Sequence, residues 1–235
     1  MRQIILDTET TGIDPKKGHR IIEIGAVEVI NRRITGSYYH QYIHPEREVE
    51  QEAIDVHGIT NEFLTDKPLF QAIVDEFIDF VKGAELIIHN APFDVGFINH
   101  ELSLLTPNNW GIIEDHCKIT DTLKMARRMY PGQRASLDAL CKRLMVDNSN
   151  RTLHGALLDS EILADVYLAM TGGQVSLGLK TQQESQFDPG TLSSSLSQSR
   201  LVEQLRLIHP SDEELAAHKA YLAQLSKESN SEINW

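Results

Sequence analysis

Hydrophobic and polar positions recur along the chain with two different periods, which divide it into predicted strands and helices. Apolar, β-branched and aromatic content predicts three strands in a meander at 3–6, 20–30 and 37–45, and another strand at 84–90. A helical period predicts helices at 68–83, 91–105, 119–132, 135–145 and 151–170. Strands followed by strands interleaved with helices indicate an α/β domain with a mixed sheet flanked by helices.

The helix predicted at 151–170 has an aspartate within its apolar stripe. At about 100° per residue, Asp159 lies on the same face as Ile162 and Val166, so its side chain is expected to point into the protein. A buried carboxylate must be protonated, paired or bound to a metal. Asp159 is therefore expected to have a partner elsewhere in the chain.

Three other carboxylates are candidates for that partner set. Asp7 and Glu9 are two residues apart at the end of a predicted strand, so both should face the same way. Asp94 lies in the first turn of a predicted helix, where an acid is ordinarily explained by the helix dipole. Phe97 and Ile98 follow it at helical spacing, which instead places Asp94 on an apolar face.

Four carboxylates on one strand and two helices could converge on a pair of divalent cations, the arrangement used in phosphoryl transfer. Oxygen ligands favour Mg²⁺ or Mn²⁺. His154 precedes Asp159 by five residues with Gly155 between them, so in a continued helix it would face away from Asp159. We expect His154 in the loop before the helix, apart from the metals, where a neutral imidazole could deprotonate water. The alternative is an ordinary surface histidine.

The net charge of −12 argues against non-specific binding to phosphates, which depends on Lys and Arg. Residues 1–173 contain 17 basic and 26 acidic residues, so the acid excess lies mainly there. A solvated acidic surface and a cation-binding cluster both fit this excess.

Signals for export or membrane insertion are missing from the sequence. No apolar run approaches the roughly 18 residues of a membrane span, and acids stand where a secretory apolar region would lie. Cys117 and Cys141 are read as small thiols in a reducing compartment. We therefore expect a soluble protein of the cytoplasm.

The composition changes after residue 173, which we take as the end of the main domain. Residues 180–200 contain 6 Ser and 4 Gln and are predicted to be a flexible linker. In segment 201–235, Ser211 and Glu214 form the pattern of a capping box before a thin apolar stripe, which predicts a short helix.

Three short motifs carry a family resemblance: "LDTETTG", "HNAPFD" and "LHGALLD". In this order and at these separations they resemble the exonuclease motifs of the DEDD family in its histidine-bearing subgroup. That resemblance implies an RNase H-like fold and two-metal removal of nucleotides from 3' ends. Through "IIEIGAVEV", "VHGIT" and "SLDALC", the first 180 residues are also similar to the epsilon subunits of bacterial DNA polymerase III, which proofread mispaired DNA ends.

The resemblance implies a role for each matching residue. Two divalent cations, Mg²⁺ or Mn²⁺, would be held by Asp7, Glu9, Asp94 and Asp159. His154 would be the general base. Contacts with the terminal nucleotide would come from Asp7, Glu9, Glu52, His57 and Asp159. For Glu52 and His57 the alternative is a helix-end acid and a turn histidine.

The resemblance also implies partners beyond the DNA 3' end. Residues Gln174 to Leu179, "QVSLGL", resemble the short peptide by which replication proteins bind the sliding clamp, beta. Segment 201–235 is expected to bind the polymerase subunit, alpha, while a contact with the small theta subunit is left open. Two rivals remain: a relative that trims RNA ends by the same chemistry, and a non-catalytic adaptor that joins polymerase to clamp.

Overall fold

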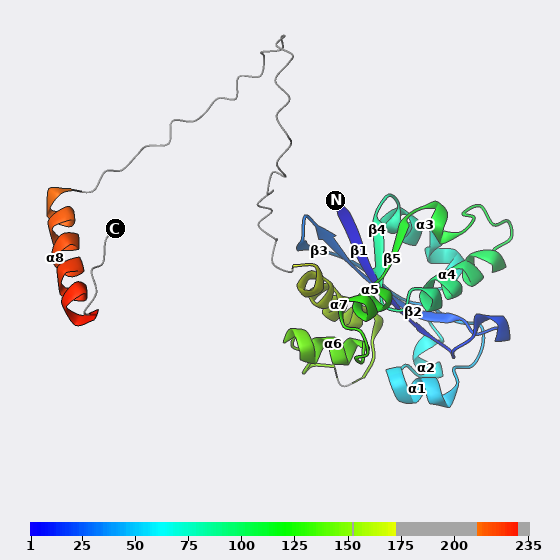
Figure 1. Ribbon diagram of the computed structural model, residues 1–235. Helices are drawn as coiled ribbons and strands as arrows, with labels where there is room; N and C mark the ends of the chain where they lie inside the picture. The colour runs from blue at the N-terminus through cyan, green and yellow to red at the C-terminus, as the bar shows by residue number, and fades with distance from the viewer. Residues whose placement is uncertain (152, 173–210, 230–235) are drawn as a thin grey trace, which may run out of the picture. The chain divides into compact units, whose positions relative to one another are not determined.

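The computed structural model describes residues 1–151, 153–172 and 211–229 (Figure 1). The chain divides into two units, Met1–Leu179 and Lys180–Trp235, each of which is described by itself. The predicted clamp-binding peptide at 174–179 and the predicted linker at 180–200 lie outside the described residues.

A five-stranded mixed sheet forms the centre of the first unit. Its strands are β1 (Arg2–Thr10), β2 (Ile21–Ile30), β3 (Arg33–Tyr42), β4 (Glu85–Ile88) and β5 (Lys118–Asp121), in the order β3-β2-β1-β4-β5. β1 is antiparallel to β2 and parallel to β4, and β5 is parallel to β4. The predicted mixed sheet is confirmed. The prediction of helix from residue 119 was wrong at its start, because a strand of four residues is too short to reveal its alternation.

Helices connect and cover the strands of this sheet. They are α1 (Gln51–His57), α2 (Asn61–Leu64), α3 (Phe70–Val81), α4 (Pro92–Leu104), α5 (Thr122–Met129), α6 (Leu137–Leu144) and α7 (Ala156–Thr171), with 3-10 turns η1 (Pro15–Lys17) and η2 (Ile113–Asp115). The short helices α1 and α2 were not predicted. α7 begins later than the helical pattern suggested, because Gly155 at its N-cap has an extended backbone.

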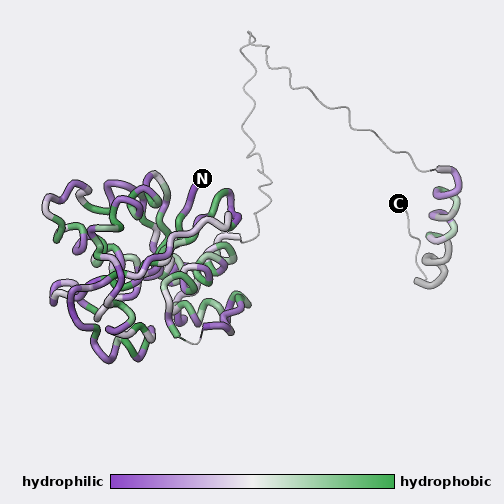
Figure 2. Tube along the Cα trace, turned by 180° about the vertical axis from the view of Figure 1, so that it is seen from behind, coloured by the Kyte–Doolittle hydropathy of each residue, from purple (hydrophilic) through white to green (hydrophobic). Residues whose placement is uncertain are grey.

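The two faces of the sheet bury separate apolar clusters. Ile4 and Leu6 of β1 pack in one cluster with residues of α3 and α4, whereas Ile5 packs on the opposite face with residues of α7. This is the alternation expected of a strand buried on both sides. Figure 2 shows hydrophobic and hydrophilic positions alternating along the helices that cover the sheet.

Strand β2 holds the first turn of α7 close against the sheet. The backbone N–H of Ala156 donates to Glu23 Oε2 at 3.1 Å, and Ser160 Oγ donates to the carbonyl of Gly25 at 2.8 Å. A Cβ on Gly25 would lie 2.2 Å from the carbonyl carbon of Ala156, so only glycine permits this approach. The start of α7 is therefore fixed to the strand beside β1.

The second unit contains α8 (Asp212–Ser229) among its described residues. Ser211 N–H donates to Glu214 Oε2 at 2.8 Å, and the Glu214 N–H donates back to Ser211 Oγ at 3.3 Å. The predicted capping box and short helix are confirmed. Within the described parts of the chain, no helix combines the length and the apolar character needed to cross a membrane.

Candidate active site

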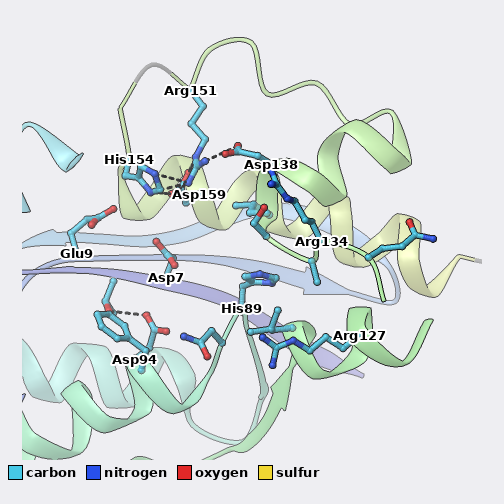
Figure 3. A pocket seen from close by; sticks show the side chains of 18 residues that line it. Asp7, Glu9, His89, Asp94, Arg127, Arg134, Asp138, Arg151, His154 and Asp159 are labelled. Carbon is cyan, nitrogen blue, oxygen red and sulfur yellow. Dashed lines mark hydrogen bonds and ion pairs between the residues drawn. The ribbon is translucent and has the colours of Figure 1, made fainter. Parts of the chain in front are cut away.

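A cavity of about 750 Å³ opens where β1 and β4 end, between α4 and the start of α7 (Figure 3). The carboxyl ends of parallel strands meet at one edge of a sheet, which is where α/β proteins commonly bind ligands. The acids and the histidine predicted from separate motifs all line this cavity: Asp7, Glu9, Asp94, Asp159 and His154. The chain thus brings together five residues that span more than 150 positions of sequence.

Strand alternation determines how the first two acids are placed. Asp7 and Glu9 share the side of β1 that carries Ile5, facing α7, while Thr8 faces α4. Burial, followed by the charges of neighbouring acids, raises the pKa of Asp7 well above its usual range. Burial and the charge of Glu23 raise the pKa of Glu9 to about 8. Both carboxyls therefore resist ionisation unless a positive charge is present.

Asp94 enters the cavity from the first turn of α4 and is 2% exposed. Thr8 Oγ1 donates a hydrogen bond to its Oδ1 at 2.8 Å, which joins β1 to α4. Burial raises the pKa of Asp94 to about 7, although the hydrogen bond from Thr8 opposes the shift. Backbone N–H groups of Asp94 and Thr8 also lower the pKa, but burial outweighs them, so a favourable position at the helix N-terminus does not by itself account for this acid.

Asp159, 3% exposed, is paired with an arginine that the sequence argument did not single out. Arg151 donates from Nη2 to Asp159 Oδ2 at 2.7 Å and from Nε to Oδ1, and its Nη1 donates to Asp138 Oδ1 at 2.8 Å. Burial would raise the pKa of Asp159, but the His154 ring and the Arg151 guanidinium beside it outweigh burial and lower the pKa. The one feature of the sequence that pointed to Arg151 was its position at the start of segment 151–170, eight residues before Asp159.

His154 lies in the loop before α7, as predicted. Its backbone N–H donates to the carbonyl of Val56 at 3.2 Å, and its half-exposed ring accepts from Arg151 Nη2 at 2.8 Å. In a continued helix the five-residue spacing would turn His154 away from Asp159, but the chain is not helical here. The loop folds back so that His154 Nδ1 lies 3.2 Å from Asp159 Oδ2.

Neither Glu52 nor His57 lines the cavity. Glu52 is exposed in the first turn of α1. His57 is 6% exposed in the last turn, where its Nδ1 accepts from the N–H of Ile59 at 3.0 Å, and burial lowers its pKa. The bond from His154 to Val56 nevertheless joins the end of α1 to the loop beside the cavity.

A buried acid behind the cavity was also missed. Glu23 is the direct partner of Glu9 in the β1–β2 register, and its Oε1 lies 2.7 Å from His40 Nε2. Two acids directly opposite each other on antiparallel strands repel. Glu23 is satisfied by His40 and by the N–H of Ala156, whereas Glu9 faces the cavity. No sequence pattern specifies this register, so the sequence offered no signal.

The donor set of this cavity fits divalent cations. Carboxylates are the ligands that Mg²⁺ and Mn²⁺ prefer, and clustered acids with raised pKa values are stabilised as anions when a cation neutralises them. One carboxylate oxygen each from Glu9 and Asp159 and one ring nitrogen of His154 lie within 4.8 Å of one another, close enough to share an ion.

Comparison with known proteins agrees with this geometry. The family model described as "Exonuclease" matches residues 4–167. The protein named "DNA polymerase III subunit epsilon" from Salmonella typhimurium is 53% identical over 237 residues, which cover 98% of this chain and 96% of that protein. The chain belongs to the epsilon-subunit family of exonucleases. This epsilon-family chain is therefore a nuclease, as the motifs indicated.

Solved structures give the same result for the epsilon-family fold. Exonuclease X in complex with 5' overhanging duplex DNA matches with a TM-score of 0.57 and 27% identity, over 72% of this chain and 91% of that chain. The nuclease domain of 3'hExo, described as a DEDDh family member bound to rAMP, matches with a TM-score of 0.62 and 21% identity, over 73% and 92%. The predicted RNase H-like fold is confirmed.

Proposed function

We propose that this chain is a metal-dependent 3'-to-5' exodeoxyribonuclease that proofreads mispaired DNA ends as a subunit of the DNA polymerase III core. The observation that carries the proposal is the convergence of four acids and His154 on one cavity in an epsilon-family exonuclease. Such a subunit would act in the cytoplasm, with the replication machinery. The name of the Salmonella relative and the DNA bound by Exonuclease X support a DNA substrate, whereas the rAMP bound by 3'hExo keeps RNA as the rival substrate.

Asp7, Glu9, Asp94 and Asp159 would hold two divalent cations, Mg²⁺ or Mn²⁺. When bound, the cations supply positive charge to the reacting phosphate. Arg151 donates one hydrogen bond to each oxygen of Asp159 in the structure, and each oxygen keeps a second lone pair with which it could bind a cation. Asp138 already binds the same guanidinium and can keep it in place.

His154 would act as the general base. Arginine only donates hydrogen bonds, so the ring nitrogen that faces Arg151 must be an acceptor. The same lone pair can take a proton from water once this one hydrogen bond from Arg151 breaks. The resulting hydroxide attacks phosphorus and the bond to the 3'-oxygen breaks. That oxygen takes up a proton, and a nucleoside 5'-monophosphate and a shortened strand are released.

Contacts outside the cavity remain part of the proposal. Glu52 and His57 would meet the terminal nucleotide, and the bond between Val56 and His154 supports this because it holds α1 beside the loop. Residues 174–179 would bind the sliding clamp, beta, and segment 201–235 the polymerase subunit, alpha. The small theta subunit would be a further partner. Changing Gln174 and Leu177 to Ala should weaken capture by the clamp, and unchanged capture would refute that contact.

The decisive experiment compares purified protein on DNA and RNA with the same frayed 3' end, in Mn²⁺ at mildly alkaline pH. We expect nucleoside 5'-monophosphates to be released from the DNA end, and no release by a matched Asp94→Ala variant. A clear preference for RNA would replace the proofreading assignment with RNA trimming. Intact DNA and RNA would favour the non-catalytic adaptor.

A further inference from the structure

The cavity has two chemically different ends. Asp7, Glu9, Asp94 and Asp159 gather at one end, and Arg127 and Arg134 line the other, with His89 between them in the view of Figure 3. A fifth lining acid, Asp138, is drawn near Arg134 and is paired with Arg151. The cavity volume of about 750 Å³ is far larger than two hydrated ions need and lies in the range of nucleotide-sized ligands. The half beyond His89 therefore has room for a part of the substrate that the acids do not bind.

Arg127 and Arg134 are exposed, and no carboxylate partner for either is found among residues 1–151, 153–172 and 211–229. Three other arginines in these ranges have carboxylate partners, Arg2 with Glu28, Arg20 with Glu101, and Arg151 with Asp159. Five more in the same ranges have none: Arg32, Arg33, Arg47, Arg128 and Arg143. Among the described arginines without a carboxylate partner, Arg127 and Arg134 are the ones that line the cavity. Their positive charge is available to an anion.

The backbone beneath Arg134 is fixed by contacts that leave its guanidinium free. The N–H of Gln133 donates to the carbonyl of Tyr130 at 3.2 Å, and Arg143 Nη2 donates to the carbonyl of Arg134 at 3.3 Å. The Arg143 guanidinium also lies 4.4 Å from the centre of the Tyr130 ring. The turn after α5 thus presents Arg134 from a held backbone.

Arg127 is presented from the last turn of α5, a helix whose first turn is capped by Asp121. Both arginines therefore project from fixed positions rather than from free loops. An arginine presented in this way can bind a phosphate through two parallel hydrogen bonds without first ordering its backbone.

We propose that Arg127 and Arg134 bind the phosphodiesters that precede the terminal nucleotide of the DNA strand. This inference rests on the proposed exonuclease function. It places the DNA strand in the cavity, running from the acids towards Arg127 and Arg134. The acid end repels every phosphate except the one neutralised by cations, so the following phosphates require the arginine end. Binding is through the backbone and independent of base sequence.

The test measures strand binding separately from hydrolysis. A 5'-fluorescein-labelled single-stranded oligothymidylate is titrated with the full-length protein in Ca²⁺, and its fluorescence anisotropy is followed. The variant with Arg127→Gln and Arg134→Gln should bind roughly 5- to 30-fold more weakly than wild type. The slope of log affinity against log salt should become shallower by about 1.4 for two lost phosphate contacts on a single strand.

Arg128→Gln is the matched control, because Arg128 is the exposed neighbour of Arg127 on α5 and does not line the cavity. It should bind the oligonucleotide like wild type. A second readout in Mn²⁺ uses the p-nitrophenyl ester of thymidine 5'-monophosphate, which has no preceding phosphodiester. In the double variant, KM for the oligonucleotide should rise by a larger factor than the rate of hydrolysis of this ester falls.

Equal binding by the double variant and the Arg128→Gln control would overturn the inference, and so would equal losses on the oligonucleotide and the ester. Failure of wild type to hydrolyse either compound in Mn²⁺ would overturn the exonuclease proposal instead. The anisotropy titration in Ca²⁺ would still decide whether the two arginines bind a strand.

Discussion

Asp94→Asn should make the metal-free protein more stable at pH 8 while weakening its response to divalent cations. Asp94 is almost fully buried and must be an anion to serve as a metal ligand, yet burial raises its pKa to about 7. Asparagine has nearly the same shape, retains an oxygen to accept from Thr8, and carries no charge. The substitution therefore removes a charge that the folded state tolerates poorly without cations.

The magnitude follows from the displacement of the pKa from 3.8 to about 7. Each pKa unit corresponds to about 1.4 kcal/mol, which gives an upper bound of about 4 kcal/mol. The pKa of the Asp94 carboxyl is higher in the folded state than in the unfolded state, so wild type loses stability as the pH rises between these two values. Allowing for water entry, we expect a gain of about 2 kcal/mol, or about 4–8 °C in Tm for a domain of this size.

Thermal denaturation in EDTA at pH 8 and pH 5 measures this effect. At pH 5 the folded carboxyl is protonated, but the unfolded one, with a pKa of 3.8, is still largely ionised, so the gain should be clearly smaller than at pH 8 without vanishing. Saturating Mg²⁺ at pH 8 should stabilise wild type more than the variant. Asp79→Asn, an exposed change on α3, is the control and should leave Tm unaltered. A variant that is less stable than wild type in EDTA at pH 8, or equally stabilised at pH 5, would refute the reasoning.

Three further changes probe other parts of the site. His154→Ala should lower the hydrolysis rate by roughly 10² to 10⁴, and calorimetry should still detect cation binding; loss of both together would make His154 a ligand rather than a base. Arg151→Gln removes the guanidinium that pairs with the buried Asp159, so the free energy of unfolding in EDTA should fall by about 3–5 kcal/mol. The loss should be smaller in saturating Mg²⁺, and urea titrations with and without Mg²⁺ measure both values. Gly25→Ala should destabilise the fold by about 1–3 kcal/mol in the same assay, because its Cβ meets the backbone of Ala156.

Local periodicity was sufficient to predict which acids point inward. Asp94 and Asp159 lie on helices whose apolar faces are defined by residues three and four positions away, and both are buried. Asp7 and Glu9 follow from alternation in a strand, and both line the cavity. These predictions succeeded because they depend on repeats of two or about 3.6 residues, which a sequence displays directly.

Features set by chain reversal or strand register were not predictable in this way. Arg151 and His154 sit in a loop, where no period relates position to direction, so the closeness of His154 to Asp159 came only from the structure. The pairing of Glu23 opposite Glu9 depends on register between strands. The strand β5 has only four residues, fewer than a pattern needs.

The attachment of α7 to β2 also bears on which sequence changes this protein can tolerate. Glu23, Gly25 and Ser160 never face the cavity, yet they set where Asp159 stands relative to β1. If the chain proofreads, a genetic screen for raised mutation rates should recover substitutions at this contact between β2 and α7 as well as at the four acids. Inherited loss of copying fidelity could then arise from a strand that contacts neither ion nor nucleotide.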